Sequence, residues 1–158
     1  MGPPLPGVRV RVRDGAIEVA GPTLFDGLLE EARSGTWYRT GDLGHLDEDG
    51  HLHVAGRVDD RIVSGGENVD PLEVEAALRA HPAVRDACVV GVPDPRWGQR
   101  VAAMVVGEVS VAELEAHLAH RLARFKHPRR WRFAEALPVS PSGKRDRRAV
   151  AAALERST

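Results

Sequence analysis

Hydrophobic and polar residues alternate along the first third of the chain. Residues 8–13 read Val-Arg-Val-Arg-Val-Arg, the dipeptide Asp-Gly follows, and the alternation resumes over residues 16–20. A period of two is typical of a half-buried strand and Asp-Gly of a type I′ turn, so the sequence predicts a β-hairpin. A second hairpin is predicted around a turn at residues 47–50, and a short helix over residues 25–33.

The pattern changes at residues 56–66, where a charged turn leads into Ser64, Gly65 and Gly66. Two adjacent glycines lose much backbone entropy on folding, which makes sense where an unusual φ/ψ or a close backbone approach is needed. We therefore expect residues 56–60 to be a hinge between a β-rich part, residues 1–55, and a second domain, residues 61–158. We also expect the glycines to contact a ligand.

The second part opens with strong helix signals. Asp70, Pro71 and Glu73 predict a helix that runs to about residue 80 and buries one apolar stripe. Residues 110–113 form a capping box, which predicts a second helix ending near residue 124. A terminal amphipathic helix is predicted from the apolar spacing of Ala149, Val150, Ala153 and Leu154.

Buried strands are predicted between these helices. Residues 87–92 and 101–106 are continuous apolar runs, joined by the polar loop 93–99, and residues 131–133 suggest a third strand. The predicted fold class is α+β. In it, the β-rich N-terminal part is joined by the hinge to a compact domain with a three-stranded sheet, a β-hairpin and flanking helices.

Composition limits the class of protein. The 158 residues are 42% hydrophobic and 28% charged, as in an ordinary globular protein, and no apolar run approaches the ~20 residues that span a bilayer. The first six residues lack the features of a signal peptide, and the single Cys88 excludes an internal disulfide. We expect a cytoplasmic protein without a membrane anchor.

Charge is distributed unevenly along the chain. Residues 121–148 hold ten basic and two acidic residues, and the remainder holds 12 basic and 21 acidic ones. Such a basic segment is either a solvated face or a site for a phosphate-bearing partner. Only Lys126 and Lys144 are lysines among 22 basic residues, which suggests that arginine cannot replace them. The residues His45, His51 and His53 lack a fourth ligand and are predicted to be surface residues, so no metal site is expected.

Three segments, residues 37–44, 56–75 and 138–148, stand in an order and spacing that resemble the C-terminal part of adenylate-forming acyl- or aryl-CoA ligases. Residues 65–68, 97–99 and 125–129 are most similar to the branch with 2-succinylbenzoate-CoA and 4-chlorobenzoate-CoA ligases. The resemblance implies two half-reactions: a carboxylate and ATP form acyl-AMP and pyrophosphate, and the acyl group then passes to coenzyme A. Residues 1–55 would be a remnant of the large N-terminal domain, and residues 61–158 the mobile C-terminal domain.

The resemblance assigns roles in the first half-reaction. Asp42 would bind the ribose hydroxyls of AMP, since a carboxylate can accept from two hydroxyls, and Arg57 would contact the ribose or phosphate. Asp59 would be the hinge residue. Lys144 would be the catalytic lysine, placing a compact positive charge where negative charge develops between the carboxylate and the α-phosphate.

Other residues would serve the second half-reaction after the domain has turned. The loop of Ser64, Gly65, Gly66 and Glu67 would border the pantetheine tunnel, where glycine leaves room for the narrow thiol arm. The nucleotide of coenzyme A would be held by an aromatic surface and cations, contributed by Trp97, Phe125, His127 and Arg129. His127 stands where a relative carries arginine, and a neutral imidazole would bind phosphate poorly.

The resemblance also implies what lies elsewhere. No Gly-rich phosphate loop precedes Arg39, so we expect the chain to be inactive without the N-terminal adenylation domain, its expected partner. The full-length enzyme would use ATP, Mg²⁺, coenzyme A and a small carboxylate, and could be a homodimer. The preferred substrate is 2-succinylbenzoate, of menaquinone biosynthesis, followed by other aryl acids and then fatty acids.

Three alternatives remain open from the sequence. The chain could be a non-catalytic module that binds coenzyme A or a carrier protein. It could be a fragment of an amino-acid-activating adenylation domain, although the similarity at Trp97 and at residues 125–129 favours free coenzyme A. It could bind nucleic acid through the basic segment, which is disfavoured because that segment also holds the Ser-Gly-Lys motif.

Overall fold

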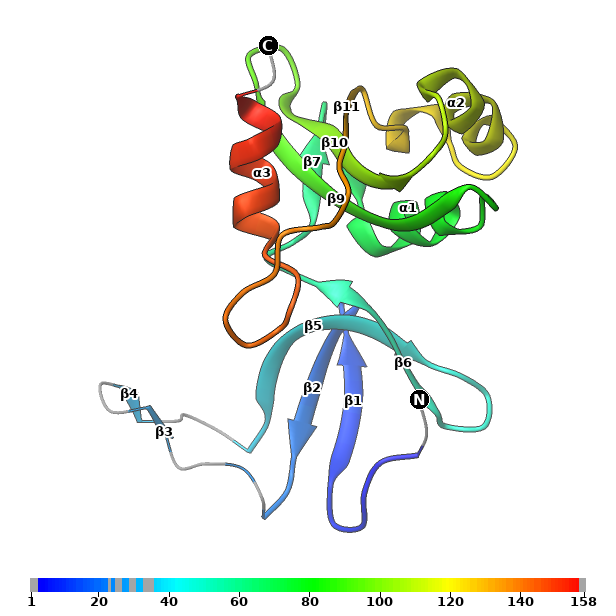
Figure 1. The fold of residues 1–158 in the computed structure, drawn as a ribbon. Coiled ribbons are helices and arrows are strands. Elements are labelled where there is room, and N and C mark those ends of the chain that lie inside the picture. Colours follow the sequence, from blue (N-terminus) through cyan, green and yellow to red (C-terminus); the bar gives the residue numbers. More distant parts are fainter. Residues whose placement is uncertain (1–2, 23, 25–26, 29–30, 33–35, 157–158) are drawn as a thin grey trace. The chain divides into compact units, whose positions relative to one another are not determined.

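The computed structural model describes residues 3–22, 24, 27–28, 31–32 and 36–156 (Figure 1). The chain divides into two compact units, Met1–Asp59 and Asp60–Thr158. The division falls within residues 56–60, to which the hinge was assigned; hinge motion itself stays a prediction. No helix in the described ranges has the length and apolar character required to cross a membrane.

The first unit contains a four-stranded antiparallel sheet in the order β1-β2-β5-β6. Strands β1 (Arg9–Arg13) and β2 (Ala16–Ala20) form the first predicted hairpin, and β5 (Tyr38–Leu46) and β6 (Leu52–Arg57) form the second. Asp14 and Gly15 both have positive φ, 51° and 75°, as a type I′ turn requires. Both hairpin predictions are confirmed, and β5 and β6 are longer than expected.

The helix predicted over residues 25–33 is wrong where the structure describes it. Two short strands, β3 (Gly27–Leu28) and β4 (Glu31–Ala32), pair with each other instead. The other five residues of that range lie outside the described residues. A nine-residue segment containing a glycine has little intrinsic helical stability, so local pairing can replace the helix.

The second unit is built on a five-stranded sheet. Strand β10 (Gly98–Gly107) pairs antiparallel with β9 (Val84–Asp94) and parallel with β11 (Arg130–Phe133). The hairpin of β7 (Ile62–Ser64) and β8 (Glu67–Val69) joins the sheet where Ser64 pairs with Gly98. The three predicted strands are confirmed. The predicted loop 93–99 is too long, because the β9–β10 ladder continues to its last pair, Asp94 with Gly98.

Three helices flank this sheet: α1 (Pro71–Arg79), α2 (Val111–Ala119) and α3 (Arg147–Glu155). The predicted N-caps are present, since Asp70 accepts from the Leu72 amide and Ser110 forms the full capping box with Glu113. Helix α2 ends at Ala119, five residues before the predicted end. The chain then turns into a 3₁₀ helix, Arg124–Lys126, which leads towards β11.

Both faces of the sheet are covered (Figure 1). One apolar cluster joins α1 and α2 to the sheet through residues such as Leu78, Val89 and Leu118, and the other joins α3 through Val90 and Leu154. Successive strand residues therefore point into different clusters. This explains why β9 and β10 read as continuous apolar runs rather than as alternating ones.

Cys88 provides a test of this packing. Its side chain is fully buried, and burial raises the pKa of the thiol to about 11. At pH 8 the thiolate fraction should be roughly a hundredfold below that of an exposed cysteine. We expect a thiol reagent to label Cys88 slowly in native buffer. Labelling should become fast only at urea concentrations that unfold the second unit. Rapid labelling in native buffer, at the rate of glutathione, would contradict this packing.

Candidate functional site

Two of the predicted nucleotide ligands lie together in the first unit. Asp42 on β5 is paired in register with Arg57 on β6, and Arg57 Nη1 donates to Asp42 Oδ1 at 3.0 Å. Asp59 Oδ2 lies 3.8 Å from Arg57 Nη2. The side chain of Arg57 is 51% exposed, so the pair adds little to stability and its groups remain available to a ligand.

The neighbouring residues explain how this pair is held. Thr40 Oγ1 donates to the Ile17 carbonyl and accepts from the Asp42 amide, both at 3.1 Å, which fixes the strand before the carboxylate. Gly41 has a φ of 78°, and a Cβ atom at this position would lie 2.9 Å from Arg57 Nη2. Glycine therefore permits both the backbone turn and the approach of the guanidinium group.

The Gly65-Gly66 pair forms the tip of the β7–β8 hairpin. The φ values of 61° and 87° are those of a turn that disfavours side chains, and Ser64 pairs with Glu67 across it. The Gly65 amide donates to the Trp97 carbonyl at 2.9 Å, and a Cβ atom on Gly65 would lie 2.5 Å from Trp97 Cε3. The structure thus brings the predicted thioester-forming loop and Trp97 together.

A buried carboxylate fixes the turn that carries Trp97. Asp94 Oδ1 accepts from the amides of Arg96 and Trp97, each at 2.9 Å, and Asp94 Oδ2 forms an ion pair with Arg100. Burial would raise the pKa of Asp94, but the amide hydrogen bonds and Arg100 outweigh it and lower the pKa. The Arg96 guanidinium stacks 4.7 Å from the centre of the Trp97 ring, which is 38% exposed.

The other predicted ligands of the CoA nucleotide follow α2. A cavity of about 570 Å³ is lined by Glu115, Ala119, Leu122, Arg124, His127, Pro128 and Arg129. His127 Nε2 donates to the Leu122 carbonyl at 3.0 Å, so this nitrogen carries a proton. The structure groups His127 with Arg129 at this cavity, whereas Phe125 and Trp97 are outside its lining. Phe125 is 38% exposed.

Lys144 lies in a compact loop that backbone hydrogen bonds close. Ser140 donates to the Lys144 carbonyl at 2.7 Å, Gly143 donates to Ser140 at 2.9 Å, and Asp146 donates to Pro138 at 3.0 Å. The Lys144 side chain is exposed, and none of the residues that the structure describes forms an ion pair or hydrogen bond with its ammonium group. The loop has a defined shape and presents an unpaired cation.

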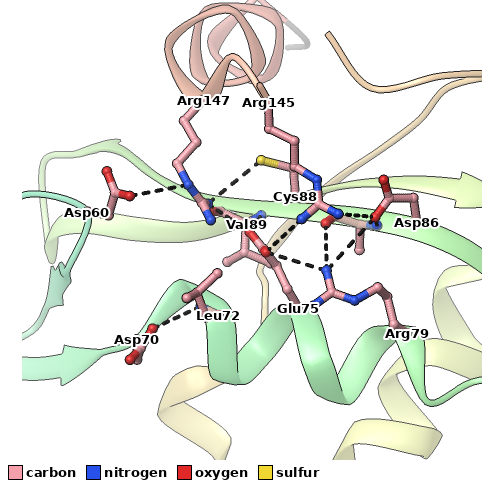
Figure 2. Close-up of polar contacts among 11 residues, drawn as sticks. Asp60, Asp70, Leu72, Glu75, Arg79, Asp86, Cys88, Val89, Arg145 and Arg147 are labelled. Carbon is pink, nitrogen blue, oxygen red and sulfur yellow. Dashed lines mark hydrogen bonds and ion pairs between the residues drawn. The ribbon is translucent and has the colours of Figure 1, made fainter. Parts of the chain in front are cut away.

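Sequence reasoning missed a network of charged residues beside this loop (Figure 2). Glu75 of α1 is completely buried, and its Oε1 accepts from the Val89 amide at 3.0 Å and from Arg147 Nη1 at 2.7 Å. Its Oε2 accepts from Arg145 Nη1 at 3.2 Å and lies 3.5 Å from Arg79 Nη1. A glutamate within the buried helix stripe, together with the Arg-Asp-Arg that follows Lys144, was the available signal.

Two further carboxylates extend this network. Arg145 Nη2 donates to Asp86 Oδ1 at 2.7 Å, and Arg147 Nε lies 3.4 Å from Asp60 Oδ2. Burial disfavours the charge of Arg147, but the neighbouring Glu75 outweighs it and raises the pKa of the guanidinium group. The two arginines after Lys144 are thus held by three acidic residues of the second unit.

The basic segment is therefore partly neutralised. Besides these two arginines, Lys126 Nζ donates to both carboxylate oxygens of Glu73, at 2.6 and 2.7 Å. Arg132 is engaged by a neutral group, the Ala153 carbonyl, to which it donates. Such pairing is atypical of a continuous phosphate-binding surface. It favours a structural role for these four of the ten cations.

The hairpin turn 47–50 holds one group that could approach a metal ion, formed by Asp47, Asp49 and His51. Asp47 Oδ1 already accepts from the amides of Asp49 and His51, and its Oδ2 lies 2.6 Å from His53 Nε2. The side-chain hydrogen bond with His53 and the backbone bond from His51 lower the pKa of Asp47. This carboxylate organises the turn, so we assign it no metal.

Comparisons with known proteins show what this chain is similar to. Residues 73–144 match the family described as AMP-binding enzyme C-terminal domain. The long-chain-fatty-acid–CoA ligase FadD13 of Mycobacterium tuberculosis is 45% identical over 111 residues, 68% of this chain and 22% of that protein. A 2-succinylbenzoate–CoA ligase of Bacillus cereus is 43% identical over 150 residues, 90% of this chain and 31% of that protein.

A solved structure extends the match to nearly all residues. The ATP-bound MatB from Rhodopseudomonas palustris aligns with a TM-score of 0.91 at 34% identity, covering 99% of this chain and 36% of that one. The chain spans about a fifth to a third of the curated relatives that it matches, with shares of 22% and 35% among the first of them. On these grounds residues 73–144 belong to the family of AMP-binding enzyme C-terminal domains.

Proposed function

We propose that this chain is the C-terminal part of an ATP-dependent acyl-CoA ligase and supplies the groups that alternate between its two half-reactions. The observation that carries the proposal is Lys144: an exposed ammonium without a partner among the described residues, on a loop of defined shape. A cation that has no structural partner is free to neutralise charge that appears only during a reaction. The names of the relatives, which are CoA ligases, support this reading.

In the first half-reaction, a carboxylate oxygen attacks the α-phosphorus of ATP and pyrophosphate leaves. Asp42 accepts hydrogen bonds from the ribose hydroxyls, and Arg57, which now donates to Asp42, orients that carboxylate. Lys144 contacts the oxygens on which negative charge builds. Mg²⁺ would accompany the phosphates of ATP. The pocket for the carboxylate belongs to the remainder of the ligase.

In the second half-reaction, the thiol sulfur of coenzyme A attacks the acyl carbon, and AMP leaves. Residues 61–158 turn about Asp59, so that Lys144 is withdrawn and the hairpin tip takes its place. Gly65 lets the Trp97 ring pack close to the hairpin tip, and the space beside Gly66 is proposed as the passage for the pantetheine arm. Trp97 is partly exposed beside them. His127 and Arg129 line a cavity that could receive the phosphates of coenzyme A, with Phe125 as a nearby aromatic surface.

The acid is proposed from the relatives. We infer an aryl or long-chain acid, with 2-succinylbenzoate preferred, because ligases for 2-succinylbenzoate and for long-chain fatty acids are among the similar proteins. The reaction uses ATP and coenzyme A, which fits a cytoplasmic enzyme of menaquinone or fatty-acid metabolism. A homodimer of the full ligase is also proposed.

The test joins this chain to the N-terminal part of a 2-succinylbenzoate–CoA ligase. Both proteins are assayed with a panel of carboxylates. We expect no pyrophosphate release from ATP by the chain alone. The joined protein should release pyrophosphate and form the thioester. Turnover by the isolated chain that Lys144→Ala abolishes would contradict the need for the larger part. Binding of coenzyme A without restored chemistry would favour a binding module instead.

A further inference from the structure

The loop that carries Lys144 is fastened by the residues directly after it. Arg145 and Arg147 reach back to a single carboxylate, that of Glu75, which comes from helix α1 some 70 positions earlier in the chain (Figure 2). Asp146, between them, caps helix α3 by accepting from the Ala149 amide at 3.0 Å and closes the loop through Pro138. The position of Lys144 therefore depends on how these three residues are held.

Both oxygens of the buried Glu75 carboxylate are paired with arginines from one distant segment. Each oxygen has a partner from the segment after Lys144, Arg147 on Oε1 and Arg145 on Oε2. A buried carboxylate without such partners would be strongly unfavourable, so the closed arrangement is strongly preferred to one in which the arginines detach. Loss of either contact would weaken the pairing of the buried carboxylate, although the Val89 amide on Oε1 and Arg79 near Oε2 would remain.

The same network reaches the start of the second unit. Arg147 Nε lies 3.4 Å from Asp60, the residue after the proposed hinge position, while its Nη1 binds Glu75 and the Val89 carbonyl, both at 2.7 Å. One side chain thus links three segments: the exit from residues 56–60, the buried strand β9, and the base of the Lys144 loop. These segments should move as one body.

We propose that Glu75 is a positioning residue for Lys144, acting through Arg145 and Arg147 to keep the loop fixed to helix α1 and to the segment at Asp60. The importance of the Lys144 position for catalysis rests on the proposed function. The attachment of the loop to Glu75 does not, and it can be measured without any reaction. Glu75 touches no substrate. Glu75 keeps the Lys144 loop rigidly attached to the second unit, so that rotation of this unit carries the ammonium group with it.

The experiment measures hydrogen exchange in the 158-residue chain, using the amides of Ser140, Gly143 and Asp146, which close the loop. We expect Arg145→Met to speed their exchange by about tenfold or more, because the charge-assisted hydrogen bonds from Arg145 to Glu75 and Asp86 no longer oppose local opening. Arg145→Lys, which keeps a cation facing Glu75 and Asp86, should restore most of the protection. Arg145 is used because it is partly exposed, so its loss threatens the fold less than loss of Glu75.

Two matched controls separate positioning from general stability. Arg79→Met removes a guanidinium that approaches Glu75 from α1 itself, and Arg148→Met removes an exposed cation from the first turn of α3. Neither should change the loop amides more than about twofold. Unchanged exchange in Arg145→Met, or an equal rise in Arg79→Met, would overturn the proposal.

A second readout uses the joined ligase described above. Arg145→Met should lower kcat for acyl-adenylate formation about tenfold at an unchanged KM for the acid, and leave thioester formation from supplied acyl-adenylate intact. A joined wild-type ligase without activity would count against the proposed function, while the exchange data would still decide the fastening. Equal adenylation by wild type and Arg145→Met would overturn the positioning role.

Discussion

Alanine in place of Lys144 is expected to lower the rate of acyl-adenylate formation by about 10²–10³-fold in the joined ligase, the usual cost of losing one charged group that stabilises a transition state. The side chain is exposed and forms no ion pair or hydrogen bond among the described residues, so folding should be unaffected. The measurement is pyrophosphate release under saturating ATP and acid. Thioester formation from supplied acyl-adenylate should stay near the wild-type rate, because Lys144 is proposed to serve only the first half-reaction.

The matched control is Lys126→Ala, which removes the chain's other lysine. That side chain is paired with Glu73, so its loss should not affect adenylation. The catalytic assignment fails if the two variants release pyrophosphate equally fast. It also fails if Lys144→Ala impairs both half-reactions to the same degree.

Loss of the Glu75 carboxylate should have the largest effect on stability. Glu75→Ala leaves Arg145 and Arg147 without their shared partner and removes the acceptor of the Val89 amide. Breaking a buried ion pair from one side typically costs about 3–5 kcal/mol. Because the chain has two units, the free energy of unfolding should be read from the exchange of amides in β9 and β10, which belong to the second unit alone.

The control for this variant is Glu115→Ala, on the exposed side of helix α2. A surface glutamate should change the unfolding free energy by no more than about 0.5 kcal/mol. A loss below about 1 kcal/mol in Glu75→Ala would show that the network contributes little to the stability of the fold. It would also weaken the case for fastening of the Lys144 loop.

Local signals predicted much of this fold correctly. The Asp-Gly turn, the Asp70 cap and the capping box at Ser110 each depend on a few adjacent residues, and each is present in the structure. The apolar runs in β9 and β10 were also recognised, because both faces of their sheet are covered. Such features need no knowledge of the rest of the chain.

The errors arose where distant residues decide the outcome. Helix α2 stops at Ala119 although Leu122 continues its apolar spacing, since the chain must turn there to deliver β11 beside β10. The loop 93–99 shrinks to a tight turn because buried Asp94 accepts two of its amides. Neither contact leaves a periodic pattern in the sequence.

The candidate site shows the same division. Motif resemblance identified Asp42, Arg57, Gly65 and Trp97, and the structure pairs the first two and the last two, although their roles remain predictions. Glu75 escaped notice because its partners are 70 and 72 positions away, and its burial depends on all of them at once. A lone glutamate in a helix looks like a surface residue until those arginines are placed.

The hydrogen bond of the Lys144 carbonyl has a consequence for engineering. The loop is closed through main-chain atoms and through the arginines that follow, so its shape is encoded separately from the side chain at position 144. Position 144 could therefore accept other reactive groups, including unnatural amino acids with photocaged or shortened amines, without redesign of the backbone. Different reactive side chains could then be placed at position 144 and compared on the same backbone.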